Sequence, residues 1–96
     1  MANKTTIAFS FTFFGDGAST SVSIDLTTGP VFFSPPVSGS ITPLFASAPS
    51  DVPLANMDCA GLTIVSRTLL LGVLTLNFSS APTNGSLYTV NGYATF

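Results

Sequence analysis

Strict alternation of apolar and polar residues is the feature of this sequence that most restricts its fold. Within residues 6–14, every odd-numbered residue is Ile or Phe, and the even-numbered residues before Phe14 are Thr, Ala or Ser. A period of two places the apolar side chains on one face of an extended strand, and that face becomes buried. The apolar positions are Ile7, Phe9, Phe11 and Phe13.

A second alternating segment runs from residue 20 to residue 26, with Val22, Ile24 and Leu26 on its apolar face. Between the two segments lies Gly15-Asp16-Gly17, whose glycines can adopt the positive φ angles of a tight turn. We therefore predict that segments 6–14 and 20–26 pair as a β-hairpin.

The C-terminal half predicts further strands at residues 62–66 and 87–96, the last with Tyr88, Val90, Ala94 and Phe96 on one face. Residues 69–78 are apolar on both parities, which indicates one strand covered on both sides. Gly72 inside that run indicates a bulge or a close approach of two backbones. Six to seven short strands in one domain, residues 1–96, predict an all-β fold, a small antiparallel sandwich or barrel.

Residues 30–54 hold six of the seven prolines and many serines. Proline cannot donate a backbone hydrogen bond to a strand ladder, so such a segment is extended or lies at a sheet edge. Its recurring apolar residues distinguish it from a flexible linker. We expect an ordered, extended Pro-rich arm that packs on the domain or on a neighbour, a short edge strand near residues 37–42, and one helical turn within residues 53–58.

Charged residues are scarce. Only 6% of the residues are Asp, Glu, Lys or Arg, whereas an average soluble domain has about 25%. A folded chain of this size exposes roughly 5,200 Å² of surface, so there is one charged residue per about 870 Å². This is close to the surface area that one partner buries in a standard protein–protein interface. Such a surface suits a subunit of an assembly better than a free monomer, because interface cores are depleted of charge. The six charged residues are Lys4, Asp16, Asp25, Asp51, Asp58 and Arg67.

Several functional classes do not fit this composition. Two basic residues are too few to bind nucleic acid through phosphate neutralisation. No apolar run reaches the length of about 20 residues that a bilayer span requires, and the N-terminal residues do not match a signal peptide. One cysteine, Cys59, cannot form an intrachain disulfide.

The sequence offers little catalytic chemistry. Without histidine there is no imidazole base and no common zinc ligand set. We interpret Cys59 as a small buried apolar residue, Asp16 as a turn residue and Asp25 as a solvent-facing strand residue. We therefore expect no enzyme activity, no catalytic residues, no cofactor and no metal site.

The N-terminal third carries a resemblance. Met1-Ala2, the alternating strand, the stretch Gly15–Ser21 and the strand Val22–Leu26 resemble small virion proteins of tailed bacteriophages over residues 5–30. The resemblance implies a many-copy structural protein located in the virion, either a capsid decoration (cement) subunit or a tail-associated subunit. It implies no catalytic residues.

Together, the resemblance and the composition predict a homo-oligomer, for example a trimer, bound to a major capsid or tail protein, with no nucleic-acid or membrane partner. Hairpin edges and the Pro-rich arm would bridge neighbouring subunits by β-augmentation. The candidate contact residues are Ala2, Asn3, Val31, Phe32, Phe33, Val37, Ile41, Leu44, Phe45, Val52 and Leu54.

Two alternatives remain. The first is a receptor- or carbohydrate-binding β-domain of a tail or fibre, which requires Tyr88 and Tyr93 to be exposed together in one groove beside Asp or Asn. The second is a small enzyme, which requires two aspartates within hydrogen-bond reach in a cleft.

Overall fold

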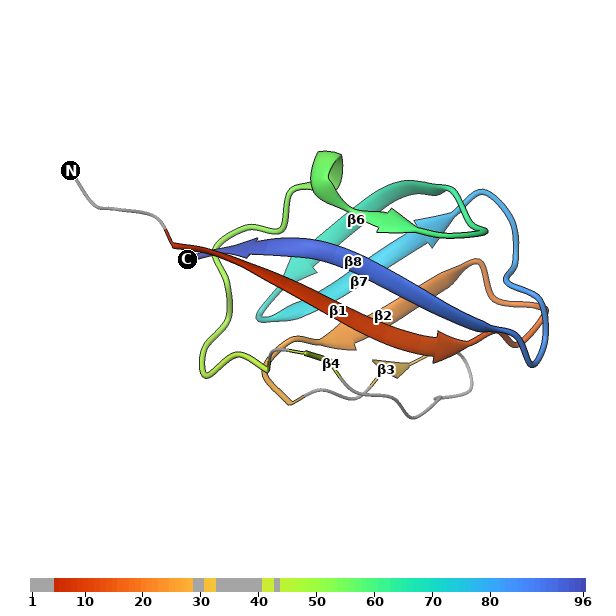
Figure 1. Ribbon diagram of the computed structural model, residues 1–96, viewed down its shortest axis with the longest axis horizontal. Coiled ribbons are helices and arrows are strands. Elements are labelled where there is room, and N and C mark those ends of the chain that lie inside the picture. Colours follow the sequence, from red (N-terminus) through yellow and green to blue (C-terminus); the bar gives the residue numbers. More distant parts are fainter. Residues whose placement is uncertain (1–4, 29–30, 33–40, 43) are drawn as a thin grey trace.

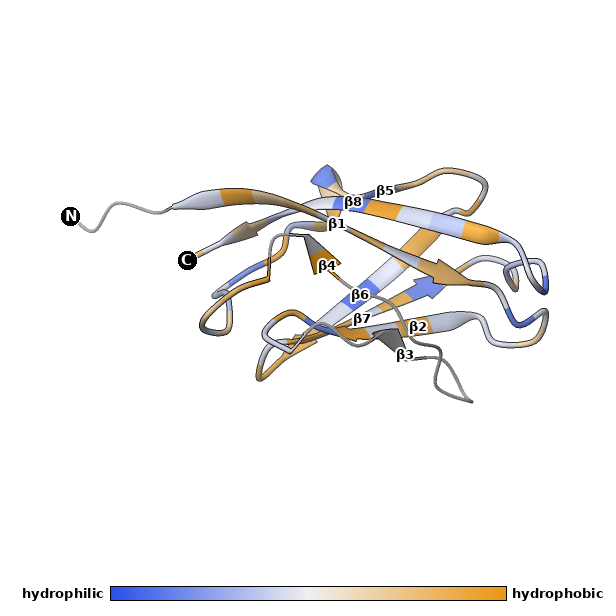
Figure 2. Cartoon of the chain, turned by 60° about the horizontal axis from the view of Figure 1, so that its bottom comes forward, coloured by the Kyte–Doolittle hydropathy of each residue, from blue (hydrophilic) through white to orange (hydrophobic). Residues whose placement is uncertain are grey.

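The computed structural model describes residues 5–28, 31–32, 41–42 and 44–96, with the backbone alone at Val31, Phe32 and Thr42. These residues form an all-β sandwich of two antiparallel sheets that face each other, as the alternation predicted (Figures 1 and 2). Within the described ranges there are five strands of five or more residues and three strands of two residues.

The first sheet has the order β4-β1-β8-β5, and we call it the β1–β8 sheet. It consists of β4 (Ile41–Thr42), β1 (Thr6–Phe14), β8 (Leu87–Thr95) and β5 (Asp58–Cys59). The second has the order β3-β2-β7-β6, and we call it the β2–β7 sheet. It consists of β3 (Val31–Phe32), β2 (Ser21–Asp25), β7 (Val73–Phe78) and β6 (Ile64–Leu70).

The core lies between the sheets and takes one parity from each long strand. Three phenylalanines of β1 point inward, and their rings form a continuous row that continues to Phe78 of β7, 5.9 Å from Phe13 between ring centroids. The strand faces predicted for segments 6–14, 20–26 and 87–96 are therefore confirmed. The core residues of the four central strands are Phe9, Phe11, Phe13, Val22, Ile24, Leu74, Leu76, Phe78, Val90 and Ala94.

The predicted hairpin of segments 6–14 and 20–26 is wrong. β1 pairs along its whole length with β8, and β2 pairs with β7, so the chain changes sheets between β1 and β2. The loop at residues 15–17 meets the β7–β8 connection instead: Gly15 N–H donates to the Ser86 carbonyl and Gly17 N–H to the Pro82 carbonyl, both at 2.9 Å. A Cβ at Gly15 would collide with the Thr83 carbonyl oxygen, so this close approach requires glycine.

Residues 69–78 are not one strand. The run is divided between β6 and β7, which pair as a hairpin, and the two residues between them, Leu71 and Gly72, have φ angles of 50° and 83°. Two positive φ angles in a two-residue loop define a type I′ turn. Gly72 is thus a turn residue. Both parities are apolar because two different strands contribute to the run.

Parts of the Pro-rich segment pack on the domain. β4 pairs with the edge of β1, and residues 44–52 place Phe45 and Val52 in the core beside Ile41. The predicted helical turn is confirmed as a short 3₁₀ helix, η1 (Leu54–Asn56). Residues 29–30, 33–40 and 43 lie outside the described residues, and they include ten of the 25 residues of the predicted arm.

Candidate interaction surface

The outward side of β1 and β8 forms an uncharged surface. These strands contribute alternate residues to it, and none of those residues is Asp, Glu, Lys or Arg. In Figure 1 the two strands cross the front of the molecule with no described segment lying over them. We call this surface the β1/β8 outer face. It consists of Thr6, Ala8, Ser10, Thr12, Phe14, Leu87, Thr89, Asn91, Tyr93 and Thr95.

Large apolar side chains stand at both ends of the β1/β8 outer face. Phe14 and Leu87 are register partners, and they are 49% and 58% exposed. Tyr93, 44% exposed, is the register partner of Ala8 near the other end. The middle of the face carries only hydroxyl and amide side chains. Large apolar side chains among uncharged polar side chains are typical of protein–protein interfaces.

Two charged side chains of the described residues form an ion pair with each other, and a third stands beside the β1/β8 outer face. Arg67 on β6 donates from Nη2 to Asp51 Oδ1 at 2.8 Å, and this ion pair links the two sheets. Asp58 of β5 is exposed and pairs in register with Asn91, so it projects from the same side of the sheet as the β1/β8 outer face. The only arginine is therefore engaged within the chain.

Asp16 and Asp25 serve in turns, and they do not form a catalytic pair. Asp16 lies in the loop between β1 and β2, whereas Asp25 is the last residue of β2. The two carboxylates therefore lie near opposite ends of β2. Hydrogen bonds from the Ser19 hydroxyl and the backbone of residues 18 and 19 lower the pKa of Asp16. The Thr27 hydroxyl and backbone lower the pKa of Asp25 in the same way. Both carboxylates remain ionised, and the turn role predicted for Asp16 is confirmed.

Cys59 is buried, as predicted, with 3% of its surface exposed. Burial, and to a smaller extent the neighbouring Asp58 carboxylate, raises the pKa of its thiol to about 11. A thiol in this state is a poor nucleophile, because the thiolate is the reactive form. Among the described residues no group of three or more His, Cys, Asp or Glu side chains could hold a metal ion.

The two tyrosines do not share a groove. Tyr88 turns toward the core, where its ring stacks on Phe13 at 5.6 Å between centroids, and its hydroxyl accepts a hydrogen bond from Thr83 N–H. Tyr93 projects from the opposite side of β8, because the residues are separated by an odd number of positions. The arrangement required by the carbohydrate-binding alternative is therefore not formed by this pair.

The predicted contact residues divide into three groups. Ile41, Phe45 and Val52 are at most 6% exposed. The described residues 41–42 and 44–52 fold back onto the sandwich and place these three side chains in the core. The three residues are therefore no longer candidates for the interface. Leu44 and Leu54 are exposed and remain candidates. The others fall outside the described residues or have only their backbone described: Ala2, Asn3, Val31, Phe32, Phe33 and Val37.

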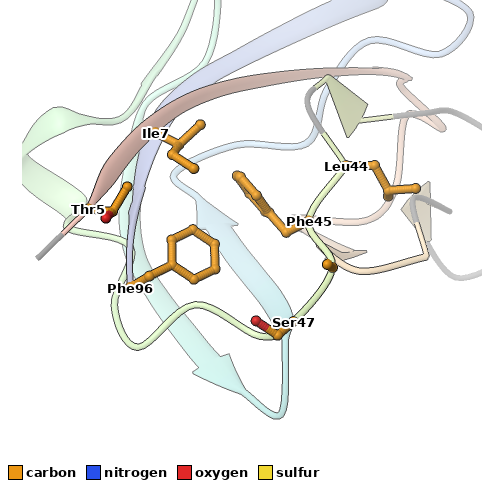
Figure 3. Close-up of a pocket in the computed structure, with 7 residues that line it drawn as sticks. Thr5, Ile7, Leu44, Phe45, Ser47 and Phe96 are labelled. Atoms are coloured by element: carbon orange, nitrogen blue, oxygen red, sulfur yellow. The ribbon is translucent and has the colours of Figure 1, made fainter.

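Leu44 borders a shallow groove of about 430 Å³ at the end of the sandwich where the chain terminates (Figure 3). Ile7 at the start of β1 and Phe96 after β8 line it, and Phe45 forms an edge-to-face contact with Phe96 at 5.1 Å between centroids. The lining is mostly apolar and carries no charged side chain.

The edge of the β2–β7 sheet carries two features that hinder strand addition. The register of β6 shifts between Ile64 and Ser66, and Arg67 is in register with buried Leu76, which places it on the inner side of the strand. A bulge and an inward-pointing charge are common protections of sheet edges. The predicted β-augmentation therefore has a poor template at β6, and the β1/β8 outer face is the better candidate.

Sequence reasoning did not select Phe14 or Leu87, and it considered Tyr93 only together with Tyr88 as a carbohydrate site. Their signal was present, because an apolar residue on the polar parity of an alternating strand must face outward once the other parity is buried. The chain matches no protein-family model, no curated protein and no solved structure. Within the described ranges, no helix has the length and apolar character needed to cross a membrane.

Proposed function

We propose that this chain is a non-enzymatic structural subunit of a virion, which assembles with copies of itself and binds a larger capsid or tail protein. The observation that carries the proposal is the uncharged β1/β8 outer face, with its exposed Phe14, Leu87 and Tyr93. β1 and β8 themselves bring no charged side chain into such a contact, and removing ions from water is the costly step in forming a charged interface.

The rest of the surface supports the same function. The chain exposes 5166 Å² and has six charged residues, two of which neutralise each other in the Arg67–Asp51 pair. Exposed apolar groups without dispersed charge favour association in solution. The virion assignment itself depends on the resemblance of residues 5–30 to small phage structural proteins.

Light scattering on the untagged protein, over a hundredfold range of concentration in moderate salt, tests the assembly. We expect a species of at least twice the 9.9 kDa chain mass that persists on dilution or dissociates at a defined concentration. A 9.9 kDa monomer at every concentration contradicts the proposal.

Mass spectrometry of density-banded particles from a culture that carries the gene tests the virion assignment separately. We expect peptides of this chain in the particle fraction at a copy number comparable with that of the major shell protein. Their absence from intact particles, with the protein present in the lysate, contradicts a location in the virion.

A further inference from the structure

We propose that Asn84 is a site of covalent modification, where the side-chain amide is lost by intramolecular deamidation when the loop contact beside it opens. The inference does not depend on the proposed function. The chain has two Asn-Gly pairs, Asn84-Gly85 and Asn91-Gly92, and the structure holds them in different ways. That difference selects Asn84 as the reactive one.

An asparagine followed by glycine carries the reacting groups for this modification. The Gly85 backbone nitrogen loses its proton to the solvent and attacks Cγ of Asn84, and no glycine side chain obstructs the approach. A cyclic succinimide forms, the bond from Cγ to Nδ2 breaks, and Nδ2 takes up a proton and leaves as ammonia. Water then opens the ring. Cleavage between the ring nitrogen and Cγ gives aspartate, and cleavage between the nitrogen and the main-chain carbonyl carbon gives isoaspartate.

The folded chain engages the attacking nitrogen. Gly85 N–H donates to the Gly15 carbonyl at 2.9 Å, and a hydrogen bond to the protonated nitrogen opposes loss of that proton. Two neighbouring hydrogen bonds join the same segments, which meet at the right end of the sandwich in Figure 1. We call these three hydrogen bonds of 2.9 Å the loop contact: Gly85 N–H to the Gly15 carbonyl, Gly15 N–H to the Ser86 carbonyl, and Gly17 N–H to the Pro82 carbonyl.

The loop contact is the part of this region that opens most readily. It lies between loops, outside the ladders of the two sheets, and Thr83, Asn84 and Gly85 are all exposed. A Cβ added at Gly85 would have no neighbour within 4 Å, so water reaches the site. Exposed loop hydrogen bonds open at a much lower free energy than those of core strands. Local opening therefore frees the Gly85 nitrogen while the sandwich stays folded.

The second pair, Asn91-Gly92, has the same chemistry in a protected place. Gly92 lies within β8 and pairs in register with Phe9 of β1, in the middle of the sheet. It is also buried, and a Cβ at this position would lie 3.0 Å from both Met57 Cγ and Phe9 Cζ. Its nitrogen becomes free only when β8 leaves the sheet, which requires unfolding of the core. Asn91 is therefore an internal control for Asn84.

The modification weakens the contact that delays it. Aspartate or isoaspartate at position 84 adds one negative charge to a chain whose formal net charge is −2. The new carboxylate stands against Gly17, in the loop that carries the ionised Asp16, and like charges repel. Isoaspartate also lengthens the backbone within the turn that Ser86 N–H closes on the Thr83 carbonyl. The modified chain therefore keeps its sandwich but has a looser loop contact.

Mass spectrometry of the full-length protein, incubated in mildly alkaline buffer with and without urea, tests the assignment. Chymotryptic cleavage after Tyr88 places the two Asn-Gly pairs on separate peptides, and each is followed for loss of the amide and for isoaspartate. In the folded protein we expect Asn84 to react at least about tenfold faster than Asn91, and more slowly than Asn84 does in urea. Equal rates at the two sites in folded protein overturn the assignment. An Asn84 rate equal to that in urea overturns the protection by the loop contact.

Two variants and a control then test the loop contact itself. Gly15→Ala forces a methyl group against the Thr83 carbonyl, and Tyr88→Phe removes the hydroxyl that accepts a hydrogen bond from Thr83 N–H. We expect both to accelerate the reaction at Asn84 several-fold and to leave Asn91 unchanged. Ile24→Val destabilises the domain from its core and should not change the Asn84 rate selectively. An unchanged Asn84 rate in folded Tyr88→Phe and Gly15→Ala proteins, or a selective acceleration in Ile24→Val, refutes the role of the loop contact.

Discussion

Replacing Leu71 with Asn should stabilise this protein, although Leu71 belongs to the most apolar run of the sequence. Leu71 has a φ angle of 50° and is 89% exposed. A left-handed conformation costs an ordinary L-residue about 1–2 kcal/mol, whereas Asn adopts it readily. Full burial of a Leu side chain stabilises a protein by about 1.5–3 kcal/mol. Because Leu71 is so exposed, removing its side chain costs only a few tenths of a kcal/mol of that stabilisation.

The expected net gain is therefore about 1 kcal/mol in the free energy of unfolding, or a rise in Tm of roughly 4–8 °C for a domain of this size. Urea unfolding followed by circular dichroism, at one protein concentration for all variants, measures it. Leu71→Ala is the control, because alanine removes the same exposed side chain but lacks the amide whose local hydrogen bonds let asparagine adopt the left-handed conformation. If Leu71→Asn is no more stable than Leu71→Ala, the turn does not store the strain that its φ angle indicates.

Three further predictions concern the core, the loop contact and the thiol. Leu74 is fully buried, so Leu74→Asp places an unpaired charge in the core and should abolish cooperative folding; a normal thermal melt of soluble mutant protein would contradict the core assignment. Gly15→Ala forces the new methyl against the Thr83 carbonyl and should cost about 1–3 kcal/mol by urea unfolding, and an unchanged midpoint would argue against the close approach of the two loops. The folded state raises the pKa of Cys59 from 9.0 to about 11. The thiol's contribution to stability is therefore complete below pH 9 and is lost as the pH rises toward 11. Cys59→Ala should reduce this alkaline loss of stability, and identical profiles of stability against pH for the two proteins would refute the linkage.

For β1, β2 and β8, the sequence alone determined which residues form the strand and which side of the strand is buried. The bounds of β1, Thr6–Phe14, coincide with the first alternating segment. The buried positions of β2 and β8 fall on the predicted parity. This information is local, because the two faces of a strand differ only by the identity of alternate side chains. The role of Asp16 was equally local, since its carboxylate bonds to residues two and three positions away.

Only the tertiary structure decided which strands pair. Backbone ladders are formed by any strand with any other, and a Gly-Asp-Gly loop serves a hairpin and a connection between sheets equally well, so the sequence could not distinguish them. The structure also decided where one apolar run divides: Leu71 has no turn propensity, and the pairing of Leu70 with Val73 imposes its positive φ. Burial of Ile41, Phe45 and Val52 depended likewise on a fold-back across the sandwich. The alternation of apolar and polar residues specifies which face of a strand is buried, because it depends only on neighbouring residues. Which strands lie beside and against that face is fixed by packing among residues that are distant in the chain.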